Sequence, residues 1–109
     1  MLYWKSTCTT CRDVRAALRL RRPDLAEKNY SRAALTVEEV RGIVQAAGGV
    51  AVVLNTTHAL AKERGWKASP PDAETFAAET VKEPNLLRRP ILVLDGRAWV
   101  GKSCSEAPL

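Results

Sequence analysis

Two cysteines separated by two residues are the part of this sequence best suited to chemistry. Cys8 and Cys11 follow a short apolar segment that ends at Tyr3-Trp4, and they precede a stretch, 13–20, with helical character. A thiol at the start of a helix faces unpaired backbone N–H groups and the positive end of the helix dipole, and both favour the thiolate. The thiolate is the reactive form of cysteine. Cys8 is therefore a candidate nucleophile and Cys11 its resolving partner.

A zinc site and a pair of inert thiols are the alternatives for these cysteines. A structural zinc site usually needs four ligands, and only Cys104 and His58 remain beside the pair. No second paired motif exists, and the position before a helix is specific, so a thiol redox site is favoured. Cys104 lies near the end of the chain and could resolve an adduct on Cys8 if that end folds back. We expect it to be an incidental thiol, and His58 to be a surface residue.

Arginines accompany the cysteines. Arg12 falls in the first turn after Cys11, and Arg89 precedes Pro90 and the best strand pattern of the chain, 91–94. An arginine beside a reactive cysteine lowers the thiol pKa and can hold an oxyanion through its planar fork. We expect such a role for Arg89, and Arg12 could share it. A proline at the start of a strand can be cis or trans, and the sequence leaves the state of Pro90 open.

The pattern of elements predicts an α/β fold. The expected elements are a strand at 2–5, a helix at 9–22, a weakly extended stretch at 25–30, helices at 37–47 and 59–64, a helix after Asp72, a strand at 91–94, a turn at Asp95-Gly96, a strand at 98–100 and a frayed tail. Thr36 and Glu39 form a capping box, and Asn55 or Thr56 could cap the short helix. The run 50–54 could be a strand or a buried segment. This order matches a thioredoxin-like fold, a mixed sheet flanked by helices, as a single domain over 1–109 with a helical insertion at roughly 37–81.

The chain is basic and ordinary in composition. It has 109 residues, a formal net charge of +5 and a pI of about 9.4. Four arginines share one face of the first predicted helix, namely Arg12, Arg15, Arg19 and Arg22. We interpret this row as a solvated surface, because no aromatic residues are interleaved as nucleic-acid stacking prefers. No stretch approaches the length of a membrane span, and the N-terminus is not a secretory signal, so we expect a cytoplasmic protein with reduced thiols and no membrane partner.

Several stretches of the chain resemble the arsenate reductase (ArsC/Spx) family. They are Lys5-Ser-Thr-Cys8-Thr-Thr-Cys11-Arg12, Leu86-Leu-Arg-Arg-Pro-Ile-Leu-Val and Val100-Gly101-Lys102, and the residues around Asn29-Tyr30, 35–39 and 54–65 follow the family's pattern as well. The resemblance implies a thioredoxin-like fold with a helical insert. In the family's reductases the first motif cysteine attacks arsenate, arginines bind the oxyanion, and a glutathione/glutaredoxin or thioredoxin system returns the electrons.

The resemblance also assigns roles to residues of this chain. It implies that Cys8 is the nucleophile and that Arg12 and Arg89 bind substrate, while Lys102 falls where some reductases place another arginine. The reductases have an arginine at the position of Thr57, so one oxyanion ligand is missing here. Cys11 is absent from the glutaredoxin-linked reductases and present in the Spx-type regulators, where the pair is a redox switch.

Three functional hypotheses follow. The first is an arsenate reductase that uses Cys8, with Cys11 or glutathione as the resolving thiol and no tightly bound cofactor. The second is a Spx-like redox-switch regulator that contacts RNA polymerase, and we expect the terminal helical region of such regulators to be largely missing here. The third is a glutathione- or thioredoxin-linked oxidoreductase without arsenate activity, which the loss of arginine at Thr57 supports. The retained Arg89-Pro90 element favours the first.

Overall fold

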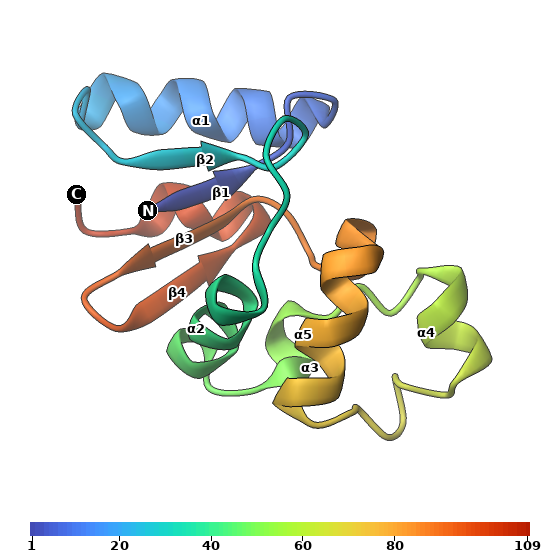
Figure 1. Cartoon of the computed structure of the whole chain (residues 1–109). Coiled ribbons are helices and arrows are strands. Elements are labelled where there is room, and N and C mark those ends of the chain that lie inside the picture. The colour runs from blue at the N-terminus through green and yellow to red at the C-terminus, as the bar shows by residue number, and fades with distance from the viewer. The chain divides into compact units, whose positions relative to one another are not determined.

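The computed structural model describes residues 1–109 and has the expected α/β architecture, a mixed sheet with helices (Figure 1). The elements in chain order are β1 (Leu2–Trp4), α1 (Thr9–Arg21), β2 (Glu27–Asn29), α2 (Val37–Ala47), α3 (Val50–Val53), α4 (Ala59–Glu63), α5 (Ala73–Lys82), the 3-10 turn η1 (Pro84–Leu86), β3 (Ile91–Leu94), β4 (Arg97–Val100) and the 3-10 segment η2 (Gly101–Glu106). None of the helices is long and apolar enough to cross a membrane.

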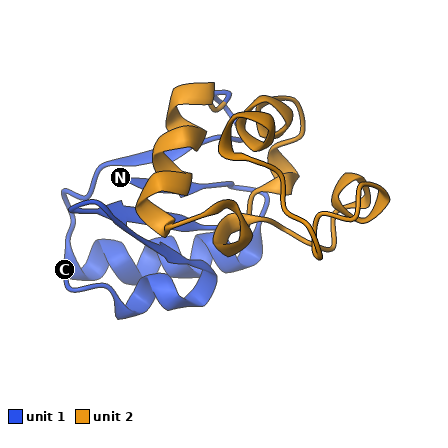
Figure 2. Cartoon of the chain, turned by 90° about the horizontal axis from the view of Figure 1, so that it is seen from below, with its two compact units in different colours: residues 1–34, 89–109 blue, residues 35–88 orange.

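The chain forms two compact units, which Figure 2 colours separately. The first contains residues 1–34 and 89–109, and the second contains the intervening residues 35–88. All four strands belong to the first unit, while α2 to α5 belong to the second. The helical segment inserted between the two halves of the sheet is therefore somewhat longer than the 37–81 that the sequence predicts.

The sheet of the first unit has the strand order β2-β1-β3-β4. β1 runs parallel to β2 and antiparallel to β3, and β3 and β4 form an antiparallel hairpin. The turn of this hairpin is Asp95-Gly96, with positive φ angles of 50° and 75°. Two consecutive left-handed residues suit the right-handed twist of a two-residue hairpin, which explains why Asp-Gly occupies the turn.

Helix α1 packs on the sheet through a buried stripe of Cys11, Val14 and Leu18. These residues share a hydrophobic core with Leu2 and Trp4 of β1 and with several others, namely Leu25, Leu92, Cys104 and Ala107. Ala17, which lies between two residues of this stripe in the sequence, is exposed. Pro23 follows the C-cap at Arg22 and cannot continue the helix.

The expectation of a frayed C-terminal tail is wrong. Residues 101–106 form η2, which packs against α1 and the end of the hairpin. Cys104 is fully buried and Ala107 is 1% exposed. The Arg21 guanidinium donates hydrogen bonds to the carbonyls of Ser105 and Ala107 at 2.7 and 2.6 Å. This segment is ordered because its small apolar residues are buried and its carbonyls accept hydrogen bonds from an arginine of α1. Its own sequence pattern does not indicate this order.

The helices of the second unit begin and end much as the sequence predicts. The capping box of α2 is present, because Thr36 Oγ1 accepts from the Glu39 N–H and Glu39 Oε1 accepts from the Thr36 N–H. Asp72 caps α5 by accepting from the Thr75 N–H at 2.7 Å. The ambiguous run 50–54 is a single helical turn, α3, followed by an antiparallel bridge between Leu54 and Leu87.

One detail of this unit differs from the sequence prediction. His58, rather than Asn55 or Thr56, caps α4, and its Nδ1 accepts from the Leu60 N–H at 3.0 Å. The buried face of α5 contains Phe76, Ala77 and Thr80.

Candidate functional site

The loop between β1 and α1 places Cys8 at the N-cap of α1. The Cys8 N–H donates to the Lys5 carbonyl, and its own carbonyl accepts from the Arg12 N–H, each at 3.1 Å. Cys8 Sγ accepts the Cys11 N–H at 3.3 Å. The sulfur therefore takes the place of the serine or threonine oxygen that usually caps a helix, and a free N–H of the first turn points at it.

Electrostatics at Cys8 favour the thiolate. Partial burial alone raises the thiol pKa, but hydrogen bonds from Cys11 and Arg89 and the positive charge of Arg89 outweigh that effect and hold the Cys8 pKa below its usual value. Because the thiolate is the nucleophilic form, this environment is suited to a nucleophilic thiol at Cys8.

Cys11 is the opposite case. It is fully buried in the core, and burial, together with the neighbouring Cys8, raises the pKa of the Cys11 thiol to about 12. The two cysteines are free thiols in the structure. The pair therefore combines one thiol whose environment favours ionisation with one that stays protonated at neutral pH.

Arg89 reaches Cys8 from the other end of the chain. It precedes Pro90 and β3, and the Arg89–Pro90 peptide bond is cis. Pro90 is buried, and its carbonyl accepts from the Gly101 N–H at 2.8 Å. The segment before β3 thus brings the Arg89 side chain to the Cys8 thiol at the start of α1.

Arg12 and Lys102, the other two residues expected to bind substrate, are placed differently. The Arg12 guanidinium donates to the Ser6 carbonyl at 3.1 Å and to Thr9 Oγ1 at 3.4 Å, so it braces the loop that carries Cys8. Lys102 borders a hollow of about 300 Å³ between α1 and η2, which Asp13 and Ser105 also line. Neither residue is among the groups that shift the Cys8 pKa.

The row of arginines on α1 is largely paired within the protein. Arg15 and Arg19 hold Glu27 of β2, with shortest N–O distances of 2.8 and 3.4 Å. Arg15 also lies over the Trp4 ring at 4.6 Å from its centre. These contacts join α1 to the strands and leave less free positive charge on this face than the sequence suggests.

Cys104 and His58 stay outside the thiol site. Cys104 is fully buried, and its sulfur lies 3.2 Å from the Trp99 carbonyl and 3.6 Å from the Pro90 carbonyl. Burial raises the pKa of Cys104 to about 11, which keeps it protonated at neutral pH. His58 is occupied as the α4 cap. No cluster of three potential metal ligands exists in the structure.

Tyr30 is a residue near the site that sequence reasoning did not single out. It follows β2 directly and is 5% exposed. Burial, and next the charge of Cys11, raise the Tyr30 pKa, while the positive charge of Arg89 opposes them. The only signal in the sequence is the Asn29-Tyr30 pair at a strand end. Asn29 Oδ1 accepts from the N–H groups of Ser6 and Ser31 and so holds the cysteine loop.

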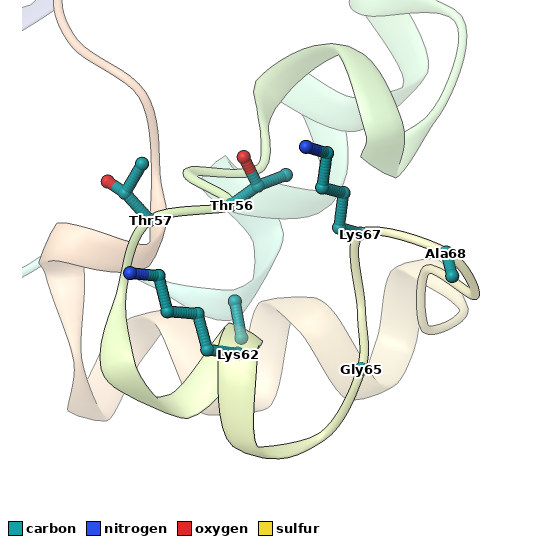
Figure 3. A pocket seen from close by; sticks show the side chains of 7 residues that line it. Thr56, Thr57, Lys62, Gly65, Lys67 and Ala68 are labelled. Carbon is teal, nitrogen blue, oxygen red and sulfur yellow. The ribbon is translucent and has the colours of Figure 1, made fainter.

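The second unit contains a separate pocket of about 590 Å³ around α4 (Figure 3). Thr57 lines it, and so do two lysines, Lys62 and Lys67. Figure 3 shows both lysine side chains standing free of the ribbon around this loop region. The pocket therefore carries the positive charge of two lysines beside Thr57.

The comparison with known proteins identifies the family. The sequence model of the ArsC family matches residues 3–107, and the chain belongs to this family. Among curated proteins, the global transcriptional regulator Spx 2 of Bacillus anthracis is 26% identical over 107 residues, which is 97% of this chain and 82% of the regulator.

Solved structures of the family share the fold. An arsenate reductase from Vibrio cholerae superposes with a TM-score of 0.77 at 24% identity, covering 97% of this chain and 92% of the reductase. An arsenate reductase (ArsC) related protein from Brucella melitensis superposes with a TM-score of 0.66 at 20% identity, covering 92% of this chain and 83% of that one. The thioredoxin-like fold of the ArsC family, as expected from the sequence, is thus confirmed, and this fold points to a thiol oxidoreductase.

Proposed function

We propose that this protein is a thiol-dependent reductase of the arsenate reductase type that acts in the cytoplasm. The observation that carries the proposal is the pairing of a Cys8 thiol of lowered pKa, at a helix N-cap, with the Arg89 side chain. A thiolate beside a guanidinium suits attack on a small tetrahedral oxyanion, since the cation neutralises the anionic substrate and keeps the sulfur ionised. The solved relative from Vibrio cholerae, named as an arsenate reductase, supports arsenate as the substrate.

The reaction proceeds in three steps. The Cys8 thiolate attacks arsenic, forming an S–As bond and releasing one arsenate oxygen as water after protonation. The Cys11 thiolate, or glutathione, then attacks the Cys8 sulfur. An S–S bond forms, the electron pair of the S–As bond stays on arsenic, and As(V) becomes As(III). Thioredoxin or glutaredoxin returns two electrons to the disulfide.

The other expected substrate ligands have subordinate roles in this proposal. Arg12 holds the loop of Cys8 through Ser6 and Thr9, and can contact the oxyanion when it leaves these partners. Lys102 contributes positive charge near the start of η2. Of the three residues, Arg89 is the one whose hydrogen bond and charge act directly on Cys8.

Arsenate-dependent oxidation of NADPH tests the proposal. The assay is run with the thioredoxin system and with the glutathione/glutaredoxin system, for the wild type and for Cys8→Ser and Cys11→Ser. Loss of turnover in both variants supports an internal disulfide, whereas loss in Cys8→Ser alone supports glutathione as the resolving thiol. Absence of turnover with both donors contradicts the arsenate assignment and leaves an oxidoreductase of another substrate.

A redox-switch regulator is the second candidate. The match to Spx regulators over nearly the whole chain favours it, and so do two cysteines of contrasting pKa at the start of one helix. In this case the Cys8–Cys11 disulfide alters binding to RNA polymerase. Binding of the purified chain to RNA polymerase, measured by biolayer interferometry before and after diamide oxidation, tests it. Binding that depends on the cysteine state, with no arsenate turnover, selects this candidate.

A further inference from the structure

The Tyr30 hydroxyl is a buried donor without a partner. Its oxygen has no hydrogen bond in the structure, although the residue is only 5% exposed. Leaving a buried hydroxyl unpaired costs about 1–3 kcal/mol, so native proteins rarely do so without a reason. A phenylalanine would fill the same space without this cost. Trp4 Nε1 and Thr80 Oγ1 are also buried without a partner, so the surroundings of the Tyr30 hydroxyl decide what role it can have.

The surroundings of Tyr30 indicate that role. The Tyr30 N–H donates to the Trp4 carbonyl at 2.9 Å, which fixes the residue where parallel strands β1 and β2 both end. The loop to Cys8 leaves the sheet at this point. Among the charged groups that act on the hydroxyl, Cys11 has the largest effect, followed by Arg89 and Cys8. The unpaired donor thus belongs to the neighbourhood of the two cysteines.

We propose that the Tyr30 hydroxyl is the hydrogen-bond donor that stabilises the Cys11 thiolate when Cys11 attacks the Cys8 sulfur. The inference deepens the proposed function and rests on its use of Cys11 as a resolving thiol. In the reduced protein Cys11 is protonated, so the hydroxyl has no Cys11 thiolate to which it can donate. Once Cys8 is bonded to another atom, its negative charge no longer opposes ionisation of Cys11. A hydrogen bond from the Lys5 backbone and the charge of Arg89 then favour the Cys11 thiolate, and the unpaired Tyr30 hydroxyl is a further donor that can join them.

Reaction with Ellman's reagent isolates this step from arsenate. The Cys8 thiolate attacks the reagent's disulfide, which gives a mixed disulfide on Cys8 and releases one thionitrobenzoate anion. The Cys11 thiolate then attacks the Cys8 sulfur, so that a Cys8–Cys11 disulfide forms and a second anion leaves. Each anion absorbs at 412 nm, and the two releases appear as successive phases. A Cys104→Ala background restricts the signal to the two site cysteines.

Tyr30→Phe is the informative variant. We expect the first phase to be unchanged and the second to slow by roughly 10-fold at pH 7, which is the size of effect that a lost hydrogen bond to an anion produces. The second phase should also need a higher pH to reach half of its maximal rate. A purely structural role of the ring would not move this pH profile. Because the hydroxyl is unpaired in the reduced state, the thermal midpoint of reduced Tyr30→Phe should equal or exceed that of the wild type.

Tyr3→Phe provides the matched control, since it removes the other tyrosine hydroxyl of the chain from β1. It should leave both phases unchanged. Two phases in the wild type with identical rates and pH profiles in Tyr30→Phe overturn the role of Tyr30 while leaving the resolving role of Cys11 intact. A wild type that releases only one anion and retains the mixed disulfide overturns both.

Discussion

The three free thiols should react with iodoacetamide at very different rates. At pH 7 a thiol with a pKa of 9 is about 1% ionised, and the lowered pKa of Cys8 raises its fraction above that. With a pKa of about 12, Cys11 is ionised in about 1 of 100,000 molecules, and Cys104, at about 11, in about 1 of 10,000. Thiolate fraction alone therefore predicts that Cys8 reacts at least about 1,000 times faster than Cys11 and about 100 times faster than Cys104.

Peptide mass spectrometry after timed labelling measures each rate separately. Between pH 7 and pH 9, labelling of Cys11 and Cys104 should rise about 10-fold per pH unit, because both remain far below their pKa values. Labelling of Cys8 should level off once the pH passes its lowered pKa. In urea the three cysteines should label at similar rates, which serves as the control. If Cys11 in the folded protein labels within about 10-fold of Cys8 at pH 7, the assignment of Cys8 as nucleophile and Cys11 as resolving thiol is refuted.

Three further perturbations follow from the structure. Arg89→Gln should shift the labelling profile of the nucleophilic thiol to higher pH, since it removes a hydrogen bond and a positive charge, whereas Arg88→Gln should leave the profile in place. Thr36→Ala should lower the free energy of unfolding by about 1 kcal/mol, measured in urea, because it breaks the capping box of α2; Thr56→Ala, which removes no cap, should not. The folded state holds the Cys104 proton more tightly than the unfolded state does, so its contribution to stability is complete below pH 9 and is lost as the pH rises towards about 11. The free energy of unfolding, measured in urea, should therefore fall by about 1 kcal/mol between pH 9 and pH 10 because of this group. Cys104→Ala should reduce that fall.

Local signals made most of the fold predictable from the sequence. The capping box of α2, the Asp72 cap and the Asp95-Gly96 turn act through neighbouring residues, and each appears where the sequence places it. The start of α1 and the position of Arg89 at the thiol site also follow from short motifs. Such features need little knowledge of the rest of the chain, since capping and turn geometry are decided within a few residues.

The features that the sequence did not reveal depend on distant partners. Residues 101–106 are ordered by Arg21 and by a core that α1 and β3 supply, and nothing in their own pattern indicates a helical turn. Arg12 follows Cys11 directly in the sequence, yet its guanidinium donates hydrogen bonds to Ser6 and Thr9. Tyr30 is adjacent to the site only because β1 and β2 end together. Burial and pairing of this kind arise from tertiary packing, which a linear pattern does not encode.

The order of segments along the chain has a consequence for how the protein is made. β1 pairs with β3, and residues 35–88 must be synthesised after β1 and before that partner exists. The second unit is contiguous, so all of its residues are available before residues 89–109 of the first unit are made, and it can fold before the first unit does. Arg89 and β3 emerge only after all of residues 35–88. Cys8 therefore remains an ordinary thiol until the second unit has been synthesised and Arg89 has followed it.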